Sequence, residues 1–317
     1  MPKTRLRLIH LLVAAALLPS AGCGGGESGT PASRTTKGDG PVHVVATTSI
    51  IADMARRIGG EHARVEALMG PGIDPHLYKA SEGDVRRLGE ADLILYNGLH
   101  LEGKMGDILT KMARSRPVVA VSEDIPRERL REPPEFAGQY DPHVWFDVSL
   151  WVTTIQPIVR ELSTLDPAHA ATFQANAAAL EKELTELDAW VEQQIATIPP
   201  AQRVLITAHD AFGYFGRRYG MDVMGIQGIS TLSEAGLKDM DRVVGSVVDR
   251  GVKAIFVESS VPRRSIEAVQ AAVRSRGKDV AIGGQLYSDS LGAAASPAGT
   301  YAGMVRANVE TIVQALR

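Results

Sequence analysis

The stretch "DPAHAATFQANAAALEKELTELDAWVEQQIATIPP", residues 166–200, decides how the chain is organised. Asp166 can cap a helix and Pro167 can take its first position. The interior is rich in Ala, Glu, Leu and Gln without Gly or Pro, and Pro199-Pro200 ends it. The stretch predicts one helix of about 30 residues, roughly 45 Å long at 1.5 Å per residue. Because so long a helix is a stiff bridge, closure of the two flanking regions over a ligand should be modest.

On both sides of this helix, short apolar runs alternate with helix-like segments. The runs typical of buried strands are "VHVVATTS", "RVEALM", "DLILYN" and "PVVAVSE" before the helix, and "RVLITA", "DVMGIQ", "KAIFVES" and "DVAIGG" after it. This alternation predicts an α/β fold of two domains, each with a mostly parallel sheet, bridged by the single long helix. We expect an N-terminal domain at residues 42–165 and a C-terminal domain at residues 201–317.

Composition agrees with two globular cores and gives no sign of a polyanionic partner. The chain has 317 residues, of which 44% are hydrophobic and 22% charged, and its formal net charge is −3. A chain of this length can build two cores. Without a basic run there is no electrostatic reason to expect nucleic acid as a partner.

The first residues predict export. Residues 1–23 combine basic residues, an apolar run too short to span a bilayer, and small residues before Cys23, the chain's one cysteine. This resembles a bacterial lipobox, in which the cysteine is lipidated, although Ser20 stands where Leu is usual; simple cleavage and secretion is the alternative. Residues 24–41 predict a flexible tether. The expected location is extracytoplasmic, in the periplasm or on the cell surface, with a lipid anchor in the membrane.

A repeated tripeptide points to the chemistry of the site. Asp-Pro-His occurs in "GIDPHLYKAS", residues 72–81, and again in "QYDPHVWFDV", residues 139–148. Proline fixes φ near −65° and restricts the residue before it, so each turn presents its histidine in a pre-set position. His76 and His143 therefore lose less conformational entropy when they bind a metal ion.

Two further candidate ligands lie at the ends of predicted strands. In a parallel α/β sheet, ligands bind beyond the carboxyl ends of the strands. His209 directly follows "RVLITA", and Asp289 follows the last predicted strand. Three imidazoles and a carboxylate suit Zn²⁺ or Mn²⁺ better than Mg²⁺ or Ca²⁺, which prefer oxygen ligands. We expect His76, His143, His209 and Asp289 to bind the ion, so that the metal site lies in the cleft between the two α/β domains.

Six other residues are candidates for supporting roles around these ligands. Asp74 and Asp141 could accept the second imidazole proton or simply cap the turn. Tyr78 and Trp145 could shield the site from water. His100 could lie in a loop near the cleft, and Glu258 could either support a ligand or have a structural role at its strand end.

The chain resembles the cluster A-I solute-binding proteins of manganese and zinc ABC importers over essentially all of residues 42–317. The motifs that carry the resemblance are "DPHLY", "NGLHLEGKM", "DPHVWFD", "AHDAFGYFGRRYG", "VESSVPRRSIEAV" and "GGQLYSDSLG", in this order. The resemblance implies two α/β domains bridged by a long helix and the ligands His76, His143, His209 and Asp289. It also implies a monomer that delivers Zn²⁺ or Mn²⁺ to an ABC permease and its ATPase.

The resemblance leaves the choice of metal open. Family members that favour manganese often have Glu at the third ligand position, whereas His209 is similar to members that bind zinc, or zinc and manganese both. The His-rich acidic loop of many zinc members is replaced here by "RERLREPPEFAGQY", and Asp289 is absent from some of them. The Irving–Williams order favours zinc in vitro.

Other function classes fit the sequence less well. The segment "GLHLEGKM" matches a P-loop pattern until Met105, which stands where Ser or Thr would bind Mg²⁺. A metal-dependent extracytoplasmic hydrolase would need an open coordination position and a general base, and the chain contains no H-E-x-x-H motif. We therefore expect a binding protein rather than an enzyme. Adhesion is an alternative secondary role, and no motif in the sequence supports it.

Overall fold

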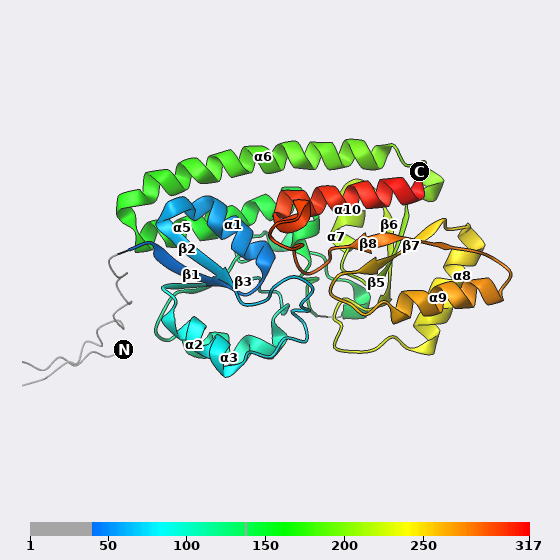
Figure 1. Cartoon of the computed structure of the whole chain (residues 1–317), viewed down its shortest axis with the longest axis horizontal. Coiled ribbons are helices and arrows are strands. Elements are labelled where there is room, and N and C mark those ends of the chain that lie inside the picture. Colours follow the sequence, from blue (N-terminus) through cyan, green and yellow to red (C-terminus); the bar gives the residue numbers. More distant parts are fainter. Residues whose placement is uncertain (1–39, 137) are drawn as a thin grey trace, which may run out of the picture. The chain divides into compact units, whose positions relative to one another are not determined.

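The structure is a computed structural model that describes residues 40–136 and 138–317. The predicted signal peptide with Cys23, and nearly all of the predicted tether, lie outside the described residues. Among the helices of the described residues, none combines the length and the apolar character that a membrane span requires. The described residues show the predicted α/β fold, with parallel strands and one long helix (Figure 1).

All strand pairs in the described part of the chain are parallel. In the first half the sheet order is β2-β1-β3-β4, and in the second half β5 pairs with β6 and β7 with β8. The strands are β1 (Val42–Ala46), β2 (Ala63–Ala67), β3 (Leu93–Tyr96), β4 (Val118–Ala120), β5 (Val204–His209), β6 (Asp222–Gln227), β7 (Ala254–Glu258) and β8 (Ala281–Leu286). Because β5 also lies against β7, the two pairs of the second half are neighbours.

Helices cover both faces of each half. They are α1 (Ser49–Gly59), α2 (Glu82–Glu90), α3 (Gly106–Met112), α4 (Val148–Trp151), α5 (Ile155–Leu165), α6 (Ala170–Ala196), α7 (Gly213–Tyr219), α8 (Leu237–Arg250), α9 (Arg264–Ser275) and α10 (Tyr301–Leu316). One apolar cluster packs α2 and α3 against the first sheet, and another packs α8 and α9 against β5, β6 and β7. A third, larger cluster contains residues of both halves.

The predicted long helix is present, and α6 is its α-helical part. It runs for 27 residues, about 40 Å at 1.5 Å per residue. Pro167–His169 form a 3₁₀ turn before it, and backbone bonds of the i→i+3 type tighten its end before Pro199. The Asp-Pro start and the Pro-Pro stop are thus where the sequence places them, but the terminal turns are not α-helical.

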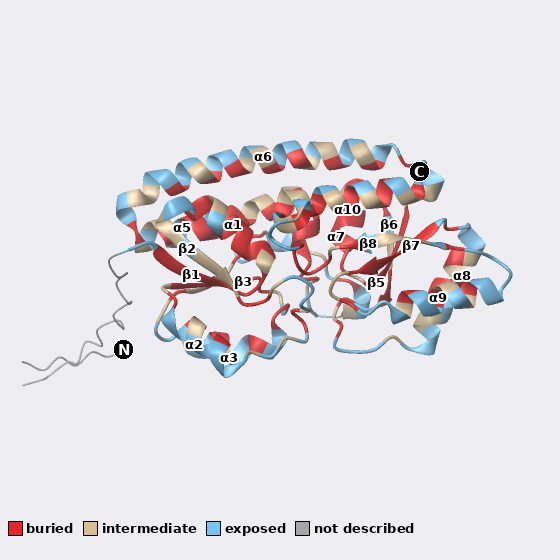
Figure 2. Ribbon diagram, viewed as in Figure 1, coloured by how far each residue is buried: buried red, intermediate tan, exposed pale blue. Residues whose placement is uncertain are grey.

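Helix α6 packs along its length rather than standing free. One face is buried against the larger cluster and the opposite face is exposed (Figure 2). The buried side chains recur every three or four positions, namely Phe173, Ala177, Leu180, Leu184, Leu187, Val191 and Ile195. Its neighbours are α1, α4 and α5 of the first half and α7 and α10 of the second. The helix therefore joins the two halves through a shared core.

Candidate metal centre

The four predicted ligands lie at or beyond the carboxyl ends of strands, where a parallel sheet places its ligand site. His76 follows β2, His143 is in the long connection after β4, His209 is the last residue of β5, and Asp289 follows β8. All four side chains are buried, with at most 3% of the surface of each residue exposed. The sheet topology thus directs residues that are far apart in sequence to one place.

Both Asp-Pro-His turns have the same local structure. The Oδ1 atom of Asp74 accepts the backbone N–H of His76 at 2.8 Å, and Asp141 Oδ1 accepts that of His143 at 3.0 Å. An aspartate that accepts the N–H two residues later closes a short turn, and the proline between them fixes its backbone. The repeated tripeptide therefore builds the same rigid support twice.

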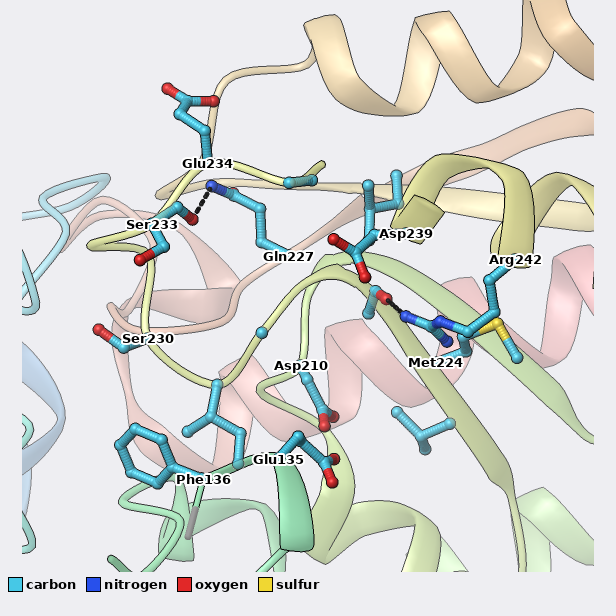
Figure 3. Close-up of a pocket in the computed structure, with 16 residues that line it drawn as sticks. Glu135, Phe136, Asp210, Met224, Gln227, Ser230, Ser233, Glu234, Asp239 and Arg242 are labelled. Atoms are coloured by element: carbon cyan, nitrogen blue, oxygen red, sulfur yellow. Dashed lines mark hydrogen bonds between the residues drawn. The ribbon is translucent and has the colours of Figure 1, made fainter. Parts of the chain in front are cut away.

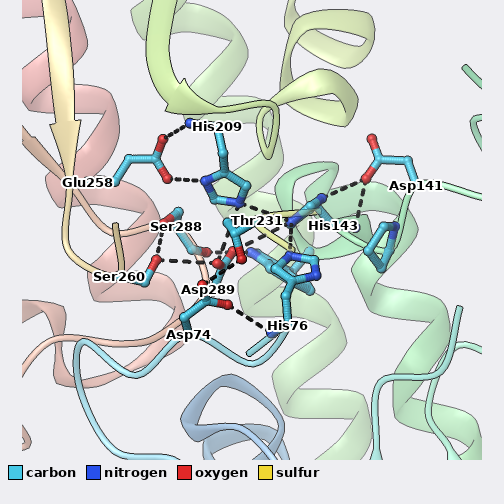
Figure 4. Close-up of polar contacts among 12 residues, drawn as sticks. Asp74, His76, Asp141, His143, His209, Thr231, Glu258, Ser260, Ser288 and Asp289 are labelled. Atoms are coloured by element: carbon cyan, nitrogen blue, oxygen red, sulfur yellow. Dashed lines mark hydrogen bonds and ion pairs between the residues drawn. The ribbon is translucent and has the colours of Figure 1, made fainter. Parts of the chain in front are cut away.

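The donor atoms of the four side chains converge on one point (Figure 4). The Nε2 atom of His143 lies 3.3 Å from Nε2 of His76, 3.4 Å from Nε2 of His209 and 3.6 Å from Asp289 Oδ1. Asp289 Oδ2 is 3.5 Å from His209 Nε2. A tetrahedron with metal–ligand bonds of about 2.0–2.1 Å has edges of about 3.3–3.4 Å. Such spacing leaves room for one first-row metal ion at the centre.

Carboxylates hold two of the three imidazoles from behind. Asp141 Oδ1 lies 2.8 Å from His143 Nδ1, and Glu258 Oε2 lies 2.6 Å from His209 Nδ1. Glu258 also accepts the backbone N–H of His209 at 2.8 Å. A carboxylate on Nδ1 fixes the tautomer so that Nε2 presents its lone pair to the metal, and it makes the ring more basic. Asp74 accepts the backbone N–H of His76 rather than a proton of its ring, so it caps the turn.

The ionisable groups of the site shift one another's pKa values. Burial lowers the pKa of His76 to about 3. Burial would also lower the pKa of His209, but the charges of Glu258 and Asp289 outweigh it and raise that pKa well above its usual value. Burial would raise the pKa of Asp289, yet the neighbouring imidazoles, His209 first, hold it well below its usual range. The charges of the metal-free site thus favour an anionic Asp289 beside a protonated His209.

The structure places the other predicted residues at different distances from the site. The Trp145 ring lies 5.3 Å from the His143 ring, centroid to centroid, and is buried beside it. Tyr78 instead donates its hydroxyl to Asp84 and packs with the α2 and α3 cluster. His100 is exposed on a loop that lines a separate hollow beside α3. Trp145 can thus shield the ligands, whereas no recorded contact brings Tyr78 or His100 to them.

Three supporting residues were not among the predicted ones. The hydroxyl of Thr231 donates to Asp74 Oδ2 at 2.6 Å, which ties the second half to the first Asp-Pro-His turn. Arg131 forms an ion pair with Asp141. Tyr214 donates its hydroxyl to the backbone carbonyl of Asp141 at 2.9 Å.

Gly213 leaves space for the Arg131 side chain. A Cβ at this position would lie 1.4 Å from Arg131 Nη1 and would overlap the guanidinium.

A hollow of about 650 Å³ opens beside β6, but it contains none of the four ligands (Figure 3). It has acidic side chains, including Asp210 next to His209, and Arg242, which donates to the carbonyl of Gly225 at 3.1 Å. Within the described residues, the group of His, Asp and Glu side chains suited to a metal is His76, His143, His209 and Asp289.

Comparisons with known proteins agree with this arrangement. A family model described as "Zinc-uptake complex component A periplasmic" (ZnuA) matches residues 44–315. The chain is 48% identical to the manganese-binding lipoprotein MntA of Bacillus subtilis (strain 168), over 93% of this chain and 94% of that protein. It is also 48% identical to the zinc-binding protein TroA of Treponema pallidum (strain Nichols), over 90% of this chain and 92% of that protein.

The fold matches a solved structure of a relative over most of its length. The periplasmic zinc-binding protein TroA from Treponema pallidum superposes with a TM-score of 0.85 at 48% sequence identity, covering 87% of this chain and 99% of that chain. The predicted fold class is thereby confirmed. The relatives named here are metal-binding proteins, and two that are equally similar in sequence carry the names of different metals.

Proposed function

The chain belongs to the zinc-uptake complex component A (ZnuA) family, and from this premise we propose that it is the binding component of an ABC importer. It captures one divalent transition metal ion outside the cytoplasm and delivers it to a membrane permease, whose ATPase supplies the energy. The observation that supports this most directly is the buried convergence of three imidazoles and one carboxylate.

His76, His143, His209 and Asp289 are the ligands of the transported ion. Their donor atoms lie within 4.8 Å of one another, and a buried aspartate among histidines is stabilised by the positive charge that an ion supplies. The Oδ1 atom of Asp289 is buried, and no hydrogen-bond donor among the described residues reaches it. A metal ion satisfies that oxygen and replaces the proton on His209.

The ion is Zn²⁺ or Mn²⁺, and Zn²⁺ binds more tightly in vitro. Imidazole nitrogen suits zinc, carboxylate oxygen suits manganese as well, and the Irving–Williams order places zinc far above manganese at a site of mixed donors. The names of the two relatives at 48% identity, one manganese-binding and one zinc-binding, support both ions as cargo.

The importer role also predicts how the chain is arranged and held. Two α/β domains at residues 42–165 and 201–317 are bridged by residues 166–200 and share the ion between them. Cys23 is lipidated, and residues 24–41 tether the monomeric binding protein to the outer face of the membrane. The word "lipoprotein" in the name of the Bacillus subtilis relative supports this anchor.

Binding and delivery explain the site better than hydrolysis. A hydrolytic metal centre keeps a coordination position open for water or substrate. Here four protein donors within 4.8 Å of one another can fill a tetrahedral shell and leave no such position. A closed shell holds an ion until the protein changes shape.

Metal uptake by cells tests this function. Cells that lack the gene are complemented with the wild-type chain, with the His76→Ala, His143→Ala double variant, or with His100→Ala as a control for an exposed histidine. Uptake of radioactive zinc and manganese should return with the wild type and the control but not with the double variant. Equal uptake with all three would refute the proposal.

A further inference from the structure

The segment that carries Asp289 follows β8 in sequence but is bonded to the other half of the chain. The backbone N–H of Leu291 donates to Ser49 Oγ at 2.9 Å, and the N–H of Gly72 donates to Ser290 Oγ at the same distance. Ser49 begins α1, and Gly72 precedes the first Asp-Pro-His turn. The two residues that follow the ligand are thus both bonded to the first half.

The far end of this segment is also held by α1. The backbone N–H of Tyr301, the first residue of α10, donates to Asp53 Oδ2 at 2.9 Å. Asp53 is buried, with 6% of its surface exposed, and lies one turn after Ser49 on the same face of α1. A carboxylate at a helix N-terminus satisfies a free N–H group and complements the helix dipole. The first turn of α10 begins beside α1 in Figure 1.

Asp289 itself has few contacts that would fix its position. Its recorded hydrogen bond outside the ligand cluster comes from Ser260 Oγ at a long 3.3 Å, and Oδ1 has no hydrogen-bond donor among the described residues. The imidazoles of His143 and His209, by contrast, have carboxylates behind them. The position of the Asp289 carboxylate therefore depends on the backbone of its segment. Trp145 holds this backbone before the ligand by donating to the Ser288 carbonyl at 2.9 Å. Ser49 and Asp53 hold it after the ligand, at Leu291 and Tyr301.

We propose that Ser49 and Asp53 of α1 are positioning residues for Asp289, and that they thereby set how well the site competes for manganese against zinc. This inference rests on the proposed metal-binding function. Asp289 is the one oxygen donor among the four ligands, and oxygen donors matter more to Mn²⁺ than to Zn²⁺, for which three imidazoles are already a good ligand set. Displacing Asp289 therefore weakens manganese binding more than zinc binding.

The test is a pair of metal titrations on the stripped, full-length mature chain. Asp53→Asn and Ser49→Ala should each lower manganese affinity about tenfold or more, the range known for residues that orient a ligand, and zinc affinity by a smaller factor. Asp239→Asn is the matched control, because this carboxylate likewise accepts a backbone N–H at a helix start, that of Gly236 before α8, at 3.0 Å. The control should leave the zinc-to-manganese ratio unchanged.

A double-variant comparison separates positioning from a general loss of structure. In the Asp289→Ala background, Asp53→Asn should cause no further loss of zinc affinity, because the residue through which it acts is gone. The inference is overturned if Asp53→Asn lowers zinc affinity equally in both backgrounds. It is also overturned if the wild type binds both ions and the zinc-to-manganese affinity ratio is unchanged in Ser49→Ala and Asp53→Asn. Neither result overturns the proposed function. If Asp53→Asn does not fold, Ser49→Ala decides the question. A wild-type chain that binds neither ion overturns both the inference and the proposed function.

Discussion

At the scale of single residues, Glu258 holds both the ring and the backbone of His209. One of its oxygens contacts Nδ1 of the ring and the other accepts the backbone N–H. Glu258→Gln keeps the shape but removes the charge, so zinc affinity should fall about 10- to 100-fold. Competition against a chelator of known affinity measures this. Glu234→Gln, at an exposed position paired with Arg264, serves as the control, and equal affinities for the two variants would contradict the role of Glu258.

Metal affinity should depend strongly on pH because of His209. Its pKa is raised in the metal-free site by Glu258 and Asp289, so its proton stays on up to a higher pH and must leave when the ion binds. Zinc affinity should therefore rise as pH rises and fall on acidification, about tenfold per pH unit for each proton displaced. Calorimetric titration in buffers of different ionisation enthalpy counts these protons. A count of zero between pH 6 and 8 would show that His209 is neutral before binding.

The four candidate ligands, which the structure brings together, could be found from the sequence because their signals are local. An Asp-Pro-His turn folds on its own residues, and a histidine directly after an apolar run marks a strand end. Thr231 and Arg131 could not be found this way, because their bonds to Asp74 and Asp141 depend on the paths of long loops. The shielding role predicted for Tyr78 rests on its place beside His76 in the sequence, whereas its hydroxyl donates to Asp84.

At the scale of elements, α6 contributes stability through its buried face. Leu184 is fully buried in the cluster shared by both halves, so Leu184→Ala should lower the free energy of unfolding by about 2–5 kcal/mol. Lys182→Ala is the control on the exposed face, because the Lys182 side chain is 80% exposed. This variant should change the free energy of unfolding by about 0.5 kcal/mol or less. Chemical denaturation measures both. Similar losses for the two variants would mean that α6 is only a connecting strut.

The sequence predicts elements with clear periodicity and misses those without it. The strands and α6 are where the apolar runs and the Pro boundaries place them. Helix α10 is not among the predicted helices, and its exposed surface is a narrow stripe of Arg306, Glu310 and Gln314. Helix α1 follows β1 after two residues, and its start was included in the predicted strand.

At the scale of the whole molecule, the shared core predicts a small movement on metal binding. The larger apolar cluster contains residues of both halves, and α6 packs against helices of each. Small-angle scattering of the stripped and zinc-loaded chain should therefore give radii of gyration within about 1 Å of each other, as for pre-organised partners. A change of several ångströms would show that the halves swing apart freely in solution.

The central claim is that one metal ion binds where the two Asp-Pro-His turns meet His209 and Asp289. The most direct test is competitive titration of zinc and manganese into the stripped mature chain and into His143→Ala, whose Nε2 lies within 3.6 Å of a donor atom of each of the other three ligands. The account predicts one tight site per chain, with zinc bound more tightly than manganese and the site lost in His143→Ala. No tight site in the wild type, or a tight site unaffected by His143→Ala, would contradict it.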